Sequence, residues 1–89
     1  MGTLTLNDGT VLQNSYALLS SGILFVYVQQ AEMTIADVFN LFIDPEKTSA
    51  ITYTQVNGEE VTFEGYTKLT AVRDEGDGLF TAVLKKAVV

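Results

Sequence analysis

The segment 23–28 (ILFVYV) constrains the fold of this chain more than any other, because six consecutive residues are apolar. Successive side chains of a β-strand point to opposite faces of a sheet, so the odd-numbered and even-numbered residues of this segment lie on different faces. A strand that is apolar on both faces needs cover on both faces. We therefore predict a central strand, with a helix on one face and a second sheet or another subunit on the other.

The segment 34–43 is the one part of the chain with the pattern of an α-helix. Thr34 can cap free N–H groups at its start, and Asp37 favours the positive end of the helix dipole. Polar residues form only a narrow stripe at spacings of three and four, and the rest of the segment is apolar. The helix is therefore expected to be almost fully buried and to end before Pro45, where one further short turn can begin.

Most of the remaining chain has the composition of short strands joined by tight turns. Asp8-Gly9, Asn57-Gly58 and the acidic, glycine-rich segment 74–78 are typical of hairpin turns, which make the flanking strands antiparallel. Strands are predicted at 3–6, 10–19, 23–28, 51–56, 61–63, 66–73 and 79–86. We predict a single α+β domain over residues 1–89, a small and mostly antiparallel β-sheet or β-roll of six to seven strands with one helix. Two three-stranded meanders would flank that helix.

The chain contains no His and no Cys, which excludes disulfides, Cys/His metal sites, thiol nucleophiles and imidazole bases. Asp74 and Asp77 lie among glycines as in a tight turn, and a calcium loop would need greater length and a distal bidentate Glu. Glu60 and Glu64 alternate with apolar residues on the polar face of a predicted strand, where solvation is the ordinary explanation. We expect no catalytic residue, no metal, no cofactor and no enzymatic activity.

The net charge of −6 comes from 11 acidic and 5 basic residues. Proteins that bind nucleic acid non-specifically need clustered Lys and Arg, so direct nucleic-acid binding is not expected. The longest apolar run falls far short of the roughly 20 residues of a membrane-spanning helix, and no basic stretch precedes an apolar one at the start of the chain. Neither membrane insertion nor secretion is expected.

The apolar content, 47% of the residues, is high for a chain that buries only about 60–65% of its unfolded surface. We therefore predict a homo-oligomer, with a dimer favoured, whose interface includes the segment 23–28 or the helix. The candidate interface residues are Phe25, Tyr27, Ile35, Phe39, Phe42 and Tyr66. If the two meanders fold onto each other, however, the second face is covered from within and a monomer suffices.

Two motifs carry a resemblance to a known group of proteins. They are Val38-Phe39-x-x-Phe42-x-Asp44-Pro45-Glu46-x-Thr48-x-x-Ile51 and Phe63-x-Gly65-Tyr66-Thr67-x-Leu69. The chain resembles short proteins encoded by phages and prophages of Gram-positive bacteria, often near tail or baseplate genes. The resemblance implies an accessory or structural phage protein that acts in the bacterial host cytoplasm or on the virion. A larger phage or host protein is the alternative partner to a second copy of the chain.

Two functions follow from these expectations. The first is a non-enzymatic protein–protein interaction and assembly module. The second is an acidic phage inhibitor of a host defence protein, which would act by mimicking nucleic acid or by sequestering a small anion. Sequestration would need Lys47, Lys68 or Arg73 to be brought together beside an aromatic face.

Overall fold

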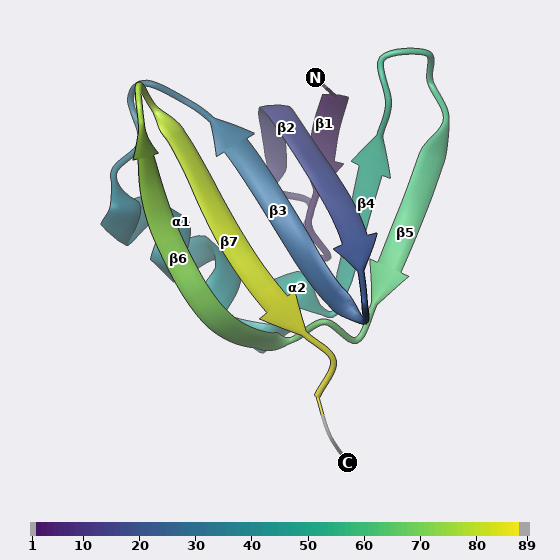
Figure 1. Cartoon of the computed structure of the whole chain (residues 1–89). Coiled ribbons are helices and arrows are strands. Elements are labelled where there is room, and N and C mark those ends of the chain that lie inside the picture. Colours follow the sequence, from purple (N-terminus) through teal and green to yellow (C-terminus); the bar gives the residue numbers. More distant parts are fainter. Residues whose placement is uncertain (1, 88–89) are drawn as a thin grey trace.

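A computed structural model describes residues 2–87, which form one seven-stranded sheet and two short helices (Figure 1). The strand order is β5-β4-β1-β2-β3-β7-β6, and every neighbouring pair is antiparallel. The strands are β1 (Gly2–Thr5), β2 (Val11–Ser20), β3 (Ile23–Gln29), β4 (Ala50–Thr54), β5 (Glu60–Glu64), β6 (Lys68–Gly76) and β7 (Leu79–Lys85), and the helices are α1 (Ile35–Ile43) and α2 (Pro45–Thr48). The predicted α+β class is confirmed, and α2 is the short turn expected after Asp44.

Strand β2 belongs to both halves of the sheet because it bends near Asn14, whose φ is 50°. The register with β1 shifts here by one extra residue, as in a β-bulge. The Ser15 hydroxyl donates to the carbonyl oxygens of Leu12 at 3.1 Å and Gln13 at 3.0 Å. The first part of β2 therefore pairs with β1 and the second with β3, and the sheet curls instead of lying flat (Figure 1).

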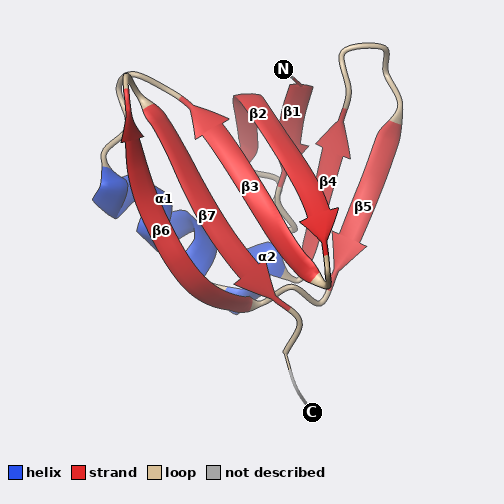
Figure 2. Ribbon diagram, viewed as in Figure 1, coloured by secondary structure: helices blue, strands red, loops and turns tan. Residues whose placement is uncertain are grey.

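The core lies on the inner side of the curled sheet. It takes Leu4 and Ile51 from the β1–β4 half and Leu24 and Leu84 from the β3–β7 half, all fully buried. Both helices lie on this inner side: in the view of Figure 2, α1 lies behind β6 and β7, and α2 is visible between β7 and β3. The even-numbered side chains of the segment 23–28 thus find the cover that their hydrophobicity requires.

The expected N-terminus of α1 is confirmed. The Thr34 hydroxyl accepts the Asp37 N–H at 3.2 Å, and the Asp37 carboxylate accepts the Thr34 N–H at 3.0 Å, which completes a capping box.

The expectation that this helix is almost fully buried is wrong. Only Val38 and Phe42 are buried, whereas Ile35, Phe39 and Ile43 form an exposed apolar stripe at spacings of four residues. The reason is that α1 packs mainly against β6, β7 and α2, and no element covers its other side within residues 2–87.

The second half of the chain does not form a continuous meander as predicted. The hairpin β4–β5 adds to β1, the hairpin β6–β7 adds to β3, and β5 and β6 therefore lie at the two ends of the strand order. The chain turns out of β5 at Gly65, whose φ is 84°. The Gly65 N–H donates to Ser49 O at 3.0 Å and its carbonyl accepts the Ala87 N–H at 3.2 Å, which fixes the crossing between the two hairpins.

Candidate interaction surfaces

The outer face of β2, β3 and β7 is apolar and is not covered by any element of residues 2–87. It faces the reader in Figure 1, and both helices lie behind the sheet. Leu18 and Val83 flank Phe25 on the two neighbouring strands, and Tyr16 pairs with Tyr27. We call this surface the outer patch; it consists of Tyr16, Leu18, Ile23, Phe25, Tyr27 and Val83.

The sequence predicts that the segment 23–28 needs cover on both faces, and the structure shows which of the two faces is covered within the chain. The two halves of the sheet do curl toward each other, but they enclose the even-numbered side chains of β3. The odd-numbered side chains of the segment 23–28 are half-buried, and among residues 2–87 only neighbouring side chains of the sheet shield them. Leu18 beside them is 43% exposed. Internal folding therefore covers one face of this strand and leaves the other open.

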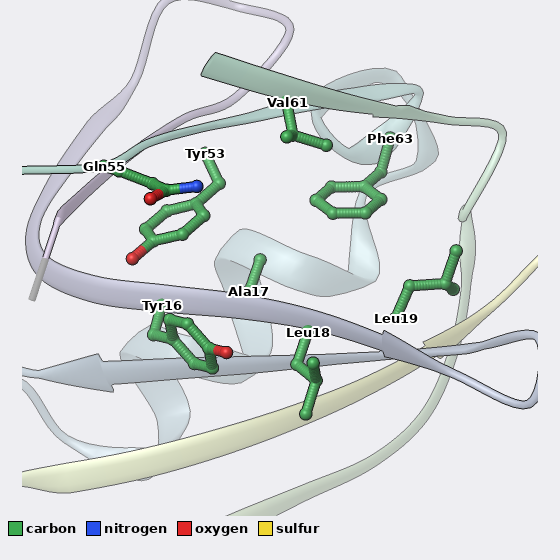
Figure 3. Close-up of a pocket in the computed structure, with 8 residues that line it drawn as sticks. All are labelled: Tyr16, Ala17, Leu18, Leu19, Tyr53, Gln55, Val61 and Phe63. Atoms are coloured by element: carbon green, nitrogen blue, oxygen red, sulfur yellow. The ribbon is translucent and has the colours of Figure 1, made fainter. Parts of the chain in front are cut away.

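A groove adjoins the outer patch, between the second part of β2 and the hairpin β4–β5 (Figure 3). Its volume is about 320 Å³, and its lining is mostly apolar and aromatic. Val61 and Phe63 reach into it from β5, and Tyr16 lies on the opposite wall (Figure 3). The Tyr16 ring meets the Tyr53 ring edge to face at 5.3 Å and stacks on Tyr27 at 6.1 Å, so the groove and the outer patch share this residue.

The groove continues into a second hollow of about 390 Å³ beside Leu19, Val61 and Phe63. Tyr66 and Lys86 also line this hollow. The lining offers few polar groups, so the groove suits apolar side chains better than a polar substrate.

A smaller groove lies between α1 and the edge strand β6. Phe39 forms one wall, Leu69 to Val72 form the other, and the volume between them is about 90 Å³. Phe39 is 45% exposed there. We call this hollow the α1–β6 groove.

The structure divides the six predicted interface residues. Phe25 and Tyr27 lie on the outer patch, and Ile35 and Phe39 lie on the exposed stripe of α1. Phe42 and Tyr66 lie in the core instead, because α1 turns Phe42 toward the sheet and Tyr66 packs edge to face against the Phe63 ring at 6.3 Å. Neither of these two presents appreciable side-chain surface to a partner.

Sequence reasoning missed Leu18, Leu19 and Val61, which are each more than 40% exposed. The adjacent leucines at the end of the predicted strand could have indicated an exposed apolar side chain. Neighbouring strand residues point to opposite faces, so when the core lies on one face of the sheet only one of the two leucines can point into it. Val83 was missed as well, and its exposure depends on strand order, which no local pattern reveals.

The basic residues are partly brought together. Lys68 and Arg73 pair with Lys85 and Thr81 of β7, so they lie on one face of β6. Lys47 lies apart in α2, where its carbonyl accepts the Asn7 N–H at 2.9 Å. The three cations considered for anion sequestration therefore do not form one cluster.

The acidic segment 74–78 is a tight turn in the structure. The Asp74 carboxylate accepts the Gly76 N–H at 2.9 Å, and Asp77 and Gly78 both have positive φ angles. Among residues 2–87, no three potential ligand side chains gather in a group that could hold a metal ion.

No helix within residues 2–87 has the length and apolar character needed to cross a membrane. Comparisons of the chain with protein-family models, with curated proteins and with solved structures found no match.

Proposed function

We propose that this protein is a non-enzymatic protein–protein interaction and assembly module that forms a homodimer through the outer patch. The observation that supports this proposal is the open outer face of β3, where Phe25 and Tyr27 lie beside Leu18 and Val83 and no element of residues 2–87 covers them. Burial of apolar surface is the dominant favourable contribution to most protein–protein association. A contiguous apolar patch on a small domain is typical of an interaction site.

A second copy of the chain is the simplest partner for this face. A two-fold axis through the patch would pack the two outer faces against each other, as the sheets of a β-sandwich pack. Lys68, Arg73 and Lys85 lie on the same side of the sheet, next to the apolar centre. An apolar centre with a polar rim is the usual anatomy of a protein interface. In the phage context that the sequence resemblance implies, such a dimer would serve as an accessory or particle component.

Two charge substitutions test the dimer. Phe25→Glu places a charge in the centre of the outer patch and is expected to give a folded monomer, because an unpaired charge at the interface costs more than the apolar contact gains. Val56→Glu is the matched control, since Val56 is 83% exposed in the β4–β5 turn, away from the patch. Light scattering with circular dichroism, at a salt concentration that screens contacts between exposed charges, should show a monomer for the first variant and a dimer for the second. A wild-type chain that is monomeric at high micromolar concentration would contradict the proposal.

The second candidate function is that of an acidic inhibitor, and the exposed carboxylates Glu59, Glu60 and Glu64 on the β4–β5 hairpin support it. Here the chain would occupy a basic nucleic-acid groove of a host protein. A monomer that competes with DNA for a purified basic host protein, with competition reduced by Glu60→Gln and Glu64→Gln, would favour this function over assembly.

A further inference from the structure

Opposite charges lie on the outer sides of segments 60–64 and 68–73 of the two edge strands; the two carboxylates of β6, Asp74 and Glu75, follow the second segment. On β5, the side chains of Glu60, Thr62 and Glu64 point to the outer side, because their neighbours Val61 and Phe63 pair with Tyr53 and Ile51 of the core. On β6, Lys68 and Arg73 point to the same outer side. Neither edge has a further strand beside it within residues 2–87.

The spacing of the charges matches as well. Glu60 and Glu64 are four residues apart along a regular strand. Lys68 and Arg73 are five apart in sequence, but the register shift between Leu69 and Ala71 inserts one extra residue, and their β7 partners are only four residues apart. The bulge therefore gives the cations the same separation along the strand as the carboxylates.

Charged residues usually prevent edge strands from pairing with one another. When β5 pairs with a second β5 over its full length, Glu60 lies opposite Glu64, and when β6 pairs with a second β6 around its bulge, Lys68 lies opposite Arg73. Like charges directly opposite each other destabilise strand pairing. Pairing of β5 with β6 places opposite charges together at both positions.

The directions of the strands decide the geometry of such a pairing. Each neighbour in the seven-stranded order is antiparallel, so the first and the last strand of the order have the same direction. Joining β5 to β6 with the outer faces on one side therefore gives a parallel pair. Opposite residues are then Glu60 with Lys68, Val61 with Leu69, Thr62 with Ala71, Phe63 with Val72, and Glu64 with Arg73.

Backbone groups on β5 are available for this pairing. The Gln55 N–H donates to Glu59 O at 2.7 Å, and alternation along an antiparallel pair then directs the N–H and C=O groups of Glu60, Thr62 and Glu64 away from β4. Those groups need a partner, which is water in a monomer and a neighbouring strand in an assembly.

The inner side of the paired strands is also complementary. In the parallel register, Val61 and Phe63 of one copy lie on the side of the sheet where Phe39 overlies Leu69 and Val72 of the next. The α1–β6 groove there has a volume of about 90 Å³, roughly three times the volume that one water molecule occupies in the liquid. It can therefore accept a small apolar side chain such as that of Val61, which is 43% exposed in the single chain.

We propose that copies of this chain assemble head to tail, with β5 of one copy added in parallel to the open edge of β6 of the next. Glu60 and Glu64 pair with Lys68 and Arg73, and Val61 enters the α1–β6 groove. The contact is heterologous, because two different edges meet, so it produces a ring or a filament. This inference goes beyond the outer-patch dimer, since it uses the two edges of the sheet and none of the outer-patch residues.

Charge reversal tests the edge contact. The test uses a Phe25→Glu background, in which the outer-patch dimer does not form, so that any remaining assembly comes from the edges. If Phe25→Glu does not fold, Leu18→Glu serves as the background. Sedimentation velocity at low salt should show concentration-dependent oligomers. The double variants Glu60→Lys/Glu64→Lys and Lys68→Glu/Arg73→Glu should each require about tenfold more protein for assembly. All four side chains are exposed, so the melting temperature should change little.

The swap of both pairs within one chain provides the decisive control. A chain with all four substitutions restores opposite charges across the contact and should assemble as the unreversed background does. Glu32→Lys/Glu46→Lys changes the net charge as the β5 variant does but lies in neither edge strand, and should leave assembly unchanged. A background chain that stays monomeric at about 1 mM, or a swapped chain that assembles no better than the double variants, would overturn the proposal.

Discussion

Asp8 and Asn57 hold equivalent positions in two hairpin loops of the same geometry. In the loops 6–10 and 55–59, the first residue donates its N–H to the carbonyl of the last, and the side-chain oxygen of the third residue accepts the N–H of the last at 3.0 Å. Because Asp-Gly and Asn-Gly favour such turns, both loops were predictable from local sequence.

The backbone hydrogen bond from Thr10 lowers the pKa of the Asp8 carboxyl below its ordinary value. The ionised form is thus favoured in the folded state, so its contribution to stability is complete above the unfolded pKa and is lost as the pH falls through the folded pKa. Carboxyl titration by NMR should show this lowered pKa, and Asn57→Asp should introduce a second carboxyl with a similarly lowered pKa. Asp8 titrating at or above its ordinary value would contradict the account of the loop.

A comparison of two glycines with positive φ distinguishes the cost of backbone strain from the cost of a steric contact. Gly58 has a φ of 92° and open space where a Cβ would lie, whereas Gly78 has a φ of 78° and a Cβ there would lie 2.9 Å from Ala31 Cα. Gly58→Ala should cost about 1–2 kcal/mol of unfolding free energy from the left-handed conformation alone. Gly78→Ala should lower the free energy of unfolding by more than Gly58→Ala does, and urea titration of the two variants measures both losses. Equal losses for the two variants would show that the Ala31 contact is relieved without cost.

At the scale of the element, the start of α1 depends on the capping box of Thr34 and Asp37. Thr34→Ala removes the side-chain acceptor and should lower the free energy of unfolding by about 1 kcal/mol, whereas Thr34→Ser should retain most of it. Urea denaturation of the two variants measures the difference. A Ser variant as unstable as the Ala variant would mean that the hydroxyl is not what stabilises this end of the helix.

The same helix shows which features can be predicted from the sequence and which cannot. Its cap and its end at Asp44 depend on neighbouring residues and were predicted correctly. Which of its apolar residues are buried depends on the side that faces β6 and β7, and that side is set by contacts between distant segments. Ile35, Phe39 and Ile43 are as apolar as the buried residues, so composition alone could not reveal that they form an exposed stripe.

At the scale of the whole molecule, the strand order was the part that the sequence could not provide. The hairpins β4–β5 and β6–β7 are each local, but nothing in their turns tells which edge of the central strands each one joins. That choice places Glu60 and Glu64 at one edge and Lys68 and Arg73 at the other. It also leaves the odd-numbered face of β3 open, and the outer patch was predictable only as an apolar strand face in need of cover.

The molar mass of the chain in solution tests the central claim, that the outer patch is covered by a second copy. We suggest light scattering on the Glu60→Lys/Glu64→Lys variant, in which head-to-tail assembly is suppressed and the outer patch and its basic rim are intact. The proposal predicts a mass twice the 9.7 kDa of one chain at high micromolar concentration, and a return to one chain when Phe25→Glu is added. A mass of 9.7 kDa without Phe25→Glu would contradict it.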